Sequence, residues 1–441
     1  MVSNTTKKIV IVGGGFGGAY TAQSLEKTMR GQDVEIILID HHNYFIFYPL
    51  LVEAGTGSVE PRHAVIPIRD FISKTRFVMA TVKSVDVSSQ TVSYELVGDT
   101  KTHSMKYDDL VIALGSVTMI PPEKFVTGVR ENAMQLKSLS DAVALRDRAI
   151  QLLELANATE DPVERKRLLT VVVVGGSFTG IEALGELEVF MRKAARLYGN
   201  VEPSDCRFVL VEMAPQLLTV MGDKLSKFTE EAMINRDIDV RLSTSIKHIA
   251  DDHIVLDSGE RLESCTTIWC AGISPHPMNK ELGLPLNDRG YIECEADMRV
   301  KGFDNVWALG DTAFNPDPEG KPYPPLAQHA MRMGKHLGKN IAAKSRGQQT
   351  TPFVFKILGS LVAMGRHQGV ANILGMKVEG FGAWVLWRMI YLMKMPRFGR
   401  RIRVALDWFI DSFTRHDVAQ LWAYRPVHFH SDESNDNEAG S

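Results

Sequence analysis

The chain is poor in cysteine and lacks a strong excess of charge of either sign. Its 441 residues include four cysteines with no Cys-x-x-Cys pair, which excludes a disulfide scaffold and indicates a reducing compartment. A balance of 50 Lys and Arg against 53 Asp and Glu argues against a general nucleic-acid binder. Residues 1–8 lead directly into an expected strand and lack the apolar region of a secretory signal, so we expect a protein of the cytoplasmic side.

The first of two strand-turn-helix motifs follows the apolar residues 9–12. It is a G-x-G-x-x-G pattern on Gly13, Gly15 and Gly18. The first glycine allows a tight turn, the second lets the backbone approach a pyrophosphate, and the third lets the helix pack on the strand. A second expected strand ends in Asp40, which is placed to bind the ribose hydroxyls of an adenosine. The alternative is a glycine-rich turn with a purely structural role.

The second motif follows residues 171–174 and carries Gly175 and Gly180, but Ser177 replaces its middle glycine. The serine side chain either crowds a pyrophosphate or donates a hydrogen bond to it. Glu212 ends the next expected strand, and an acid there favours NADH over NADPH because it repels a 2′-phosphate. Glu182 is either a carboxylate facing the nicotinamide or an ordinary first-turn acid, and the sequence favours the second interpretation.

Two such motifs on one chain suggest that a nicotinamide passes a hydride to a flavin. A third segment, residues 305–311, predicts a strand that ends in Gly310 and Asp311, where a carboxylate would reach the ribityl chain of FAD. Residues 324–328 then predict a helix start, because proline suits a first turn. The N-terminus of that helix would stabilise the reduced, anionic flavin ring. In the same helix, His329 is either part of an acceptor pocket or a packed histidine.

On these motifs the chain resembles the type II NADH:quinone oxidoreductases, which are single-subunit flavoproteins that do not pump protons. The resemblance runs from Lys8 to about Tyr424 and is carried by residues 10–18, 39–51, 107–115, 175–187, 267–272, 308–311, 324–334 and 365–366, and by the aromatic, basic C-terminus. It implies bound FAD, NADH as a substrate and a membrane quinone as the electron acceptor.

The resemblance also implies the site residues. FAD is expected at Gly13, Gly15, Gly18, Asp40, Gly310, Asp311, Ala327 and Gln328, NADH at Gly175, Ser177, Gly180, Glu182, Glu212 and Gly272, and catalytic roles at Glu182, Gln328 and Arg332.

Two departures from the family pattern fall on the acceptor side. Arg332 stands where the family commonly has a second glutamine, and Ile357, Leu358 and Gly359 replace an Asp-Lys-Gly, so a lysine is lost. Arg332 is a candidate to supply the missing positive charge. With Ser177, these changes leave two alternatives open: a flavoprotein that reduces a soluble acceptor, and a flavin-bearing redox sensor that no longer turns over.

The expected fold is α/β, with two Rossmann-like domains and a C-terminal amphipathic helical module. The expected boundaries are residues 1–125 and 300–343 for the FAD domain, 126–299 for the NADH domain, 344–430 for the C-terminal module and 431–441 for a disordered acidic tail. A broken helix is expected over residues 146–167, and a linker over residues 344–352. Cys265 and Cys270 are interpreted as structural, and no cluster of His, Cys and acidic residues suggests a metal.

The C-terminal module combines aromatic, apolar and basic residues. Residues 384–395 are apolar except for two cations, far short of the roughly 20 apolar residues of a membrane-spanning helix. One face of the next expected helix gathers Ile402, Ala405, Leu406, Phe409, Ile410 and Phe413. Residues 388–403 hold six cations and no acid, which favours peripheral attachment to the cytoplasmic face of an anionic membrane. The alternatives are a homodimer interface and core packing.

Overall fold

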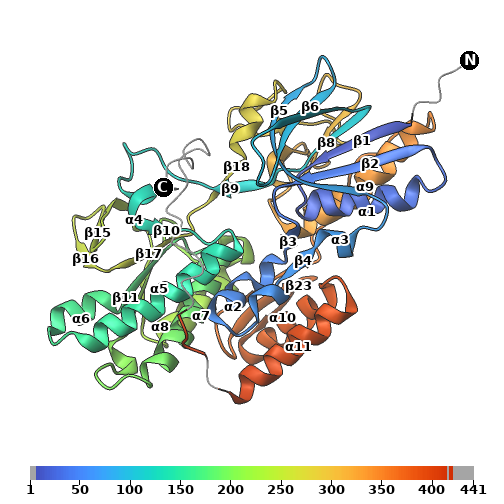
Figure 1. Ribbon diagram of the computed structural model, residues 1–441. Coiled ribbons are helices and arrows are strands. Elements are labelled where there is room, and N and C mark those ends of the chain that lie inside the picture. Colours follow the sequence, from blue (N-terminus) through green and yellow to red (C-terminus); the bar gives the residue numbers. More distant parts are fainter. Residues whose placement is uncertain (1–5, 415–416, 421–441) are drawn as a thin grey trace, which may run out of the picture. The chain divides into compact units, whose positions relative to one another are not determined.

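A computed structural model describes residues 6–414 and 417–420, and these residues form two compact units (Figure 1). Unit 1 comprises the described residues of Met1–Ile46, Val65–Val117 and Ile273–Ile357, and unit 2 comprises Phe47–Ala64, Thr118–Gly272 and the described residues after Ile357. The division falls at other positions than the expected domain boundaries. Residues 273–299 cluster with unit 1, and the C-terminal module clusters with unit 2 instead of standing alone. The predicted acidic tail, residues 431–441, lies outside the described residues, as do residues 1–5.

Unit 1 is built on a seven-stranded sheet. Its strands, in spatial order, are β20 (Val306–Ala308), β8 (Asp109–Ile112), β1 (Lys7–Val12), β2 (Val34–Asp40), β5 (Arg76–Asp86), β6 (Thr91–Leu96) and β7 (Thr102–Lys106). The first five run parallel, and β6 and β7 add an antiparallel extension. Strand order reverses at β1, which has β2 on one side and β8 on the other. Open parallel sheets bind their ligands at such a switch point, beyond the carboxyl ends of the strands.

The remaining elements of unit 1 are short, apart from two helices. They are α1 (Phe16–Thr28), β3 (Tyr44–Ile46), β4 (Val65–Pro67), α3 (Ile68–Phe71), β9 (Ser116–Thr118, which ends at the first residue of unit 2), β18 (Ile273–Pro275), β19 (Ile292–Glu293), β21 (Ala313–Phe314), α9 (Ala327–Ser345), and the 3-10 turns η5 (Pro277–Glu281) and η6 (Gly310–Thr312).

Helices α1 and α9 lie side by side, in blue and orange in Figure 1. Two glycines of α9 permit this close contact. A Cβ on Gly334 would lie 2.4 Å from the Gly17 carbonyl oxygen, and a Cβ on Gly338 would lie 2.5 Å from the Ser24 Cβ. The Ser24 hydroxyl also donates to the Lys335 carbonyl oxygen at 2.8 Å. The start of α9 is thereby fixed against the helix that follows the first glycine turn.

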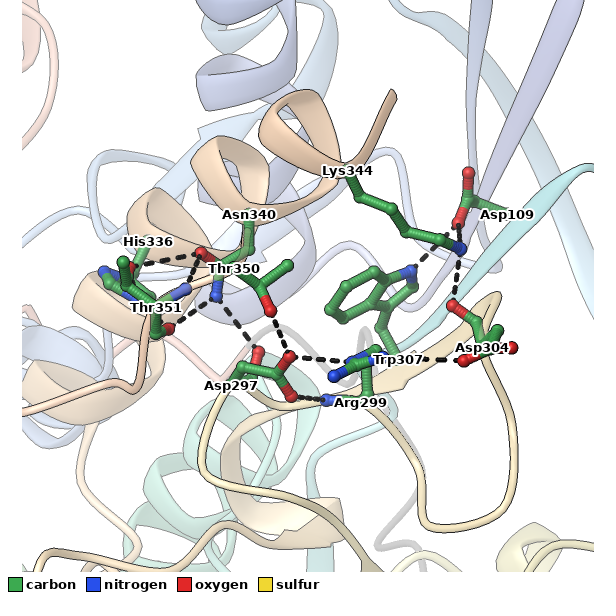
Figure 2. A network of polar contacts seen from close by, with 10 residues as sticks. All are labelled: Asp109, Asp297, Arg299, Asp304, Trp307, His336, Asn340, Lys344, Thr350 and Thr351. Atoms are coloured by element: carbon green, nitrogen blue, oxygen red, sulfur yellow. Dashed lines mark hydrogen bonds and ion pairs between the residues drawn. The ribbon is translucent and has the colours of Figure 1, made fainter. Parts of the chain in front are cut away.

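A polar network ties the C-terminal end of α9 to the sheet of unit 1 (Figure 2). The buried Asp109 carboxylate forms an ion pair with Lys344 at 3.4 Å and accepts a hydrogen bond from the Trp307 indole N–H at 3.1 Å. It also pairs with Lys7 at 2.7 Å, so two cations compensate one buried acid. A linker is expected over residues 344–352, but Lys344 and Ser345 belong to α9. Beyond the helix, the Thr351 N–H donates to the Asn340 amide oxygen at 3.1 Å.

Unit 2 repeats the parallel architecture. Its central sheet has the order β10 (Ala133–Met134), β17 (Thr266–Trp269), β11 (Thr170–Val174), β12 (Arg207–Val211) and β13 (Ile238–Arg241). All four pairings are parallel, and the order reverses at β11 as it does at β1. Every residue of β11 is buried, which explains the four consecutive valines after Thr170, since both faces of the sheet are covered.

The other elements of unit 2 include an antiparallel sheet that precedes its last two helices. They are η1 (Tyr48–Leu50), α2 (Leu51–Thr56), η2 (Pro61–His63), α4 (Val129–Asn132), α5 (Leu139–Ala158), α6 (Pro162–Leu168), α7 (Phe178–Ala195), η3 (Pro203–Asp205), η4 (Thr219–Met221), α8 (Asp223–Ile234), β14 (Ile246–Ile249), β15 (His253–Leu256), β16 (Arg261–Glu263), β22 (Gly359–Ala363), β23 (Gly369–Ile373), β24 (Met376–Glu379), α10 (Gly380–Lys394) and α11 (Phe398–Phe413).

The α/β fold with two Rossmann-like sheets and C-terminal helices is confirmed. The broken helix expected over residues 146–167 is α5 followed by α6, with α6 capped by Asp161 and begun by Pro162. Within residues 6–414 and 417–420, no helix has both the length and the apolarity needed to cross a membrane.

Candidate functional site

The first glycine turn, in unit 1, has the geometry that a bound pyrophosphate requires. Gly13 has a φ of +100°, and a Cβ there would lie 2.3 Å from the Ala113 carbonyl oxygen at the end of β8. A Cβ on Gly18 would lie 1.8 Å from the Gly13 carbonyl oxygen. Gly15 differs, because a Cβ there would meet no protein atom within 4 Å. Two glycines are therefore required by the protein itself, and the third leaves open space at the N-terminus of α1, as a phosphate group needs.

Asp40 closes this turn from the end of β2. Its Oδ2 accepts the Gly14 N–H at 2.5 Å, and its Oδ1 accepts the His42 N–H at 2.7 Å. The carboxylate is thus held beside the glycine turn, where the expected ribose would lie. Asp40, His41 and His42 also form the one cluster of potential metal ligands among the described residues, with ligand atoms within 4.8 Å of one another. The sequence interpretation had noted no such cluster, and the backbone bonds of Asp40 give its carboxylate a positioning role instead.

The third segment reaches the same edge of the sheet. Asp311 follows β20 and lies in η6, where the Ser116 hydroxyl donates to its Oδ2 at 3.0 Å. Ser116 follows β8, and the sequence interpretation missed it because a single serine after a strand carries no distinctive pattern. Ala327 begins α9, with partly buried Gln328 as its second residue and no capping side chain at the N-terminus. Pro324 and Pro325 precede the N-cap Leu326, so the expectation that they form the first turn is wrong, although a helix does start here.

An aromatic cluster surrounds the first half of α9. Arg332, the candidate replacement for the lost lysine, stacks on Phe355 with 4.2 Å between its guanidinium carbon and the ring centroid. His329 is buried, its Nδ1 lies 2.7 Å from the Pro324 carbonyl oxygen, and burial lowers its pKa. These contacts favour the interpretation of His329 as a packed histidine, and they anchor Arg332 to the segment that leads to Leu358.

The second glycine turn, in unit 2, matches the first closely. Gly175 has a φ of +108°, and a Cβ there would lie 2.8 Å from the Cys270 carbonyl oxygen, which follows β17. A Cβ on Gly180 would lie 1.9 Å from the Gly175 carbonyl oxygen. Gly272 has a φ of +98° and lies at the same edge of the sheet. The residues expected to bind the second dinucleotide are therefore brought together, with Glu182 as the exception.

Glu212 repeats the arrangement of Asp40. Its Oε2 accepts the Gly176 N–H at 2.5 Å, and its Oε1 accepts the Ala214 N–H at 2.7 Å. Ser177 occupies the place of Gly15 as the N-cap of α7, with an extended backbone and an exposed side chain that caps no backbone N–H of the helix. The Ser177 side chain therefore meets no steric conflict with the protein.

Glu182 is the fifth residue of α7, so the preferred interpretation of a first-turn acid is wrong. Its partly buried Oε1 accepts the Ala363 N–H at 3.3 Å and the Trp387 indole N–H at 3.2 Å. Both donors belong to the C-terminal module, in β22 and α10. Burial raises the pKa of Glu182 to about 8, so its carboxyl holds a proton at neutral pH.

Two more buried glutamates lie in this part of unit 2, and the sequence interpretation missed both. Glu53 of α2 accepts the Trp408 indole N–H at 2.8 Å and pairs with Arg388 at 3.4 Å. Glu186 lies one turn beyond Glu182, and burial together with the nearby Glu53 raises its pKa to about 8. Burial also raises the pKa of Glu53. The pattern Glu-x-x-x-Glu on α7 was the available signal, but only the fold brings α2, α10 and α11 against it.

The last two helices expose a wide apolar surface, which we call the C-terminal apolar face. Its members are Phe381, Met389, Met393, Phe398, Ile402, Leu406, Phe409, Ile410 and Phe413, all exposed. Arg397 and Arg403 lie exposed beside it. Three of the six cations expected there are bonded within unit 2: Arg388 to Glu53, Arg400 to the Arg62 carbonyl and Arg401 to the Met395 carbonyl. Trp387, which lies in the apolar and basic run expected at a membrane surface, is buried, and so is Trp408. Their indole N–H groups donate to Glu182 and Glu53.

All four cysteines are free thiols. Burial raises the pKa of Cys270 to about 12, which keeps the thiol protonated and fits a structural residue. Cys265 and Cys270 are partly buried and form no disulfide.

The chain matches two family models. The model for pyridine nucleotide-disulphide oxidoreductases covers residues 7–334, and that for the NDH2 C-terminal domain covers residues 357–417. Residues 7–334 include both glycine turns, and the second model begins at the segment that leads into β22.

Several known proteins are similar over nearly the whole chain. A probable NADH dehydrogenase of Dictyostelium discoideum is 33% identical over 94% of this chain and 91% of its own length. A type II NADH:quinone oxidoreductase of Mycobacterium tuberculosis is 30% identical over 92% of this chain and 87% of its own length. Among solved structures, NDH2 from Plasmodium falciparum in complex with NADH has a TM-score of 0.86 at 19% identity, covering 94% of this chain and 100% of that chain, a likeness of fold.

Proposed function

Because this chain belongs to the type II NADH:quinone oxidoreductases, within the pyridine nucleotide-disulphide oxidoreductase family, we propose that it passes electrons from NADH through bound FAD to a quinone without pumping protons. The observation that carries the proposal is the presence of two matched glycine turns, each closed by an acid at the end of the next strand. The flavin supplies the redox chemistry when bound, and the protein supplies binding, orientation and protons.

FAD is assigned to unit 1. Gly13 and Gly18 form a turn that no side chain fits, and the open space at Gly15 suits the pyrophosphate. Asp40 would bind the adenosine ribose, and Asp311, oriented by Ser116, would bind the ribityl chain. Gly310 lets the chain turn towards that position, and the uncapped start of α9 at Ala327 and Gln328 would stabilise negative charge on the ring.

NADH is assigned to unit 2, with the adenosine ribose on Glu212 and the pyrophosphate at Gly175, Ser177 and Gly180. Gly272 lines the same edge of the sheet. A carboxylate beside the ribose disfavours a 2′-phosphate, so NADH is the expected substrate and NADPH a poor one. The exposed Ser177 hydroxyl caps no backbone N–H of α7, and it would donate its own proton to the pyrophosphate.

The acceptor side is assigned to Gln328 and Arg332, with Arg332 supplying the charge that Leu358 does not. Replacing Arg332 with Gln is expected to raise the KM for a short-chain quinone and leave reduction by NADH unchanged. Unchanged quinone kinetics would remove Arg332 from the acceptor site.

A proton donor is proposed at Glu182. Reduction of a quinone takes up two protons, and an acid with a pKa raised to about 8 is protonated at neutral pH yet able to release its proton. Its bonds to Ala363 and Trp387 fix the carboxyl, so the side chain is positioned by the C-terminal module.

Peripheral membrane attachment through the C-terminal apolar face is proposed as the route to a membrane quinone. Phe409 and Phe413 are 64% and 78% exposed, and Arg397 and Arg403 would meet anionic headgroups. Replacing both phenylalanines with Ser should reduce binding to anionic phosphatidylglycerol vesicles, whereas Val163→Ser, a change of a 72% exposed side chain on α6, should not. A shift from dimer to monomer in the double variant, with unchanged vesicle binding, would support the homodimer alternative instead.

The function is tested by anaerobic titration of the purified holoenzyme with NADH, followed by a short-chain quinone. Bleaching of the flavin absorption by NADH and its return on adding quinone are expected. A flavin that NADH bleaches but quinone does not reoxidise would favour a soluble acceptor. A flavin that NADH leaves oxidised would contradict the enzyme assignment and favour the redox-sensing alternative.

A further inference from the structure

Unit 2 contains a cavity that neither glycine turn contributes to. Its volume is about 660 Å³, within the range of about 300–1,000 Å³ typical of small-molecule sites. The charged residues of its lining are Arg165, Lys166, Arg192, Asp205, Arg207 and Asp237. These residues come from α6, the last turns of α7, the η3 turn, the start of β12 and the loop after α8.

The cavity lies at the opposite edge of the sheet from the proposed NADH site. Arg207 is the first residue of β12, whereas Glu212 directly follows its last residue. A strand of five residues spans about 16 Å at about 3.3 Å per residue. Dinucleotides bind beyond the carboxyl ends of parallel strands, so a ligand in this cavity would occupy a separate site.

The lining carries an excess of positive charge, with four cations against two acids. Arg192 and Arg207 are paired with Glu188 at 3.2 Å and Asp239 at 3.0 Å. Arg165 donates only to the carbonyl oxygens of Ala156 and Thr159, and the exposed Lys166 side chain makes no ion pair within the described residues. Two cations of the lining, Arg165 and Lys166, therefore enter no ion pair within the described residues, and the acids Asp205 and Asp237 lie in the same lining.

Further features of the lining suit an anion. The Asp205 carboxylate accepts the Glu202 N–H at 2.9 Å in a local capping box, which engages it within its own turn. Burial raises the pKa of Cys206 to about 12, so its thiol stays neutral and does not repel an anion.

We propose that this cavity binds a small molecule bearing phosphate groups, at a site distinct from both dinucleotide sites. Guanidinium groups match the oxygen pattern of phosphates, and Lys166 adds a mobile ammonium at the rim. Such a ligand would connect α6, α7 and the first residue of β12, and would stabilise unit 2 because it binds only the folded state. The site requires no redox step, so it does not rest on the proposed function.

The probe is inorganic tripolyphosphate, added to the holoenzyme saturated with NAD⁺ so that the second dinucleotide site is filled. Isothermal titration calorimetry at low ionic strength is expected to show saturable binding of one tripolyphosphate per chain, with a matching rise in Tm. Lys166→Glu should weaken this binding at least tenfold and leave turnover with NADH and quinone unchanged.

The matched control is Lys339→Glu, which makes the same change at an exposed lysine of α9 in unit 1 and should bind tripolyphosphate as the wild type does. Arg165→Lys should bind tripolyphosphate with intermediate affinity, because lysine keeps the positive charge but lacks the planar set of N–H donors of a guanidinium group. Non-saturable binding, or equal weakening in the Lys166 and Lys339 variants, would show attraction by overall charge and overturn the proposal.

Discussion

The glycine turns of the two units have nearly the same backbone conformation and the same close contacts. Gly13 and Gly175 have φ values of +100° and +108°, and a Cβ on Gly18 or Gly180 would lie 1.8 or 1.9 Å from the preceding glycine's carbonyl oxygen. Asp40 and Glu212 each accept one N–H of the glycine turn at 2.5 Å. Each also accepts, at 2.7 Å, the N–H of the residue two positions after itself. Positions that face the protein are alike because packing constrains them.

The two turns differ at the position that faces the ligand. Gly15 in unit 1 becomes Ser177 in unit 2, and both are exposed at the N-terminus of their helices. A Cβ on Gly15 would meet no protein atom within 4 Å, so the protein itself does not require glycine there. The packing of the protein therefore does not decide the residue at the middle position, and under the proposed assignment the ligand constrains it.

The two units also differ in how some of their buried acids are compensated. In unit 1, Asp109 is compensated by Lys344 (Figure 2) and by Lys7. In unit 2, Glu53 has the single cation Arg388, and burial raises the pKa values of Glu182 and Glu186 to about 8. The buried Asp109 of unit 1 is therefore neutralised by charge pairing, whereas Glu182 and Glu186 of unit 2 keep protons near neutral pH.

The largest expected effects come from the third glycine of each turn. Gly18→Ala forces a Cβ into the Gly13 carbonyl, at a cost of about 1–3 kcal/mol or more, and should yield protein without flavin colour. Gly180→Ala should retain the flavin, because only the second turn is distorted. The rate at which NADH reduces that flavin should fall about 100-fold or more. Absorption spectra and stopped-flow reduction measure the two outcomes.

Gly199→Ala is the control for both, since a Cβ at that exposed glycine meets nothing within 4 Å and should change neither property. Loss of flavin in the Gly180 variant, or its retention in the Gly18 variant, would break the assignment of one dinucleotide to each unit.

A smaller effect is expected from the acid of unit 2. Glu212→Gln removes the charge that repels a 2′-phosphate and weakens the ribose contact. The ratio of kcat/KM for NADH to that for NADPH should fall about tenfold, equivalent to about 1.4 kcal/mol. Glu231→Gln, at an exposed acid of α8, should keep the wild-type ratio. An unchanged ratio in the Glu212 variant would mean that the ribose lies elsewhere.

Ser177→Gly makes unit 2 resemble unit 1 at the middle position. If the hydroxyl donates to the pyrophosphate, the KM for NADH should rise about 2- to 10-fold, the range of one hydrogen bond worth about 0.5–1.5 kcal/mol. Steady-state kinetics provide the measurement. A lower KM would instead show that the serine crowds the ligand, and that unit 2 tolerates it at the expense of affinity.

The sequence predicted the parts of the site that depend on local pattern. Strand, glycine turn, helix and terminal acid recur at fixed spacing, so the places of Gly13, Asp40, Gly175 and Glu212 followed from the chain alone. The partners of Glu182 did not, because Trp387 lies 205 positions away and only tertiary packing brings α10 to α7. The same limit applies to Arg388, which the sequence places among the cations of residues 388–403, whereas the fold pairs it with Glu53.

The smallest expected effect tests the protonated acid of unit 2 through stability. Burial raises the pKa of Glu182 from 4.5 to about 8, so the folded protein retains a proton that the unfolded chain releases. The stability contributed by Glu182 is complete below about pH 4.5 and declines as the pH rises through about 8. Glu182→Gln removes this titration, and the loss of Tm between about pH 5.5 and pH 8.5 should therefore shrink by about 1–4 °C. Glu231→Gln should keep the wild-type slope, because that acid is exposed. An identical slope in the Glu182 variant would show that the carboxyl is ionised throughout, and would remove it as the proposed proton donor.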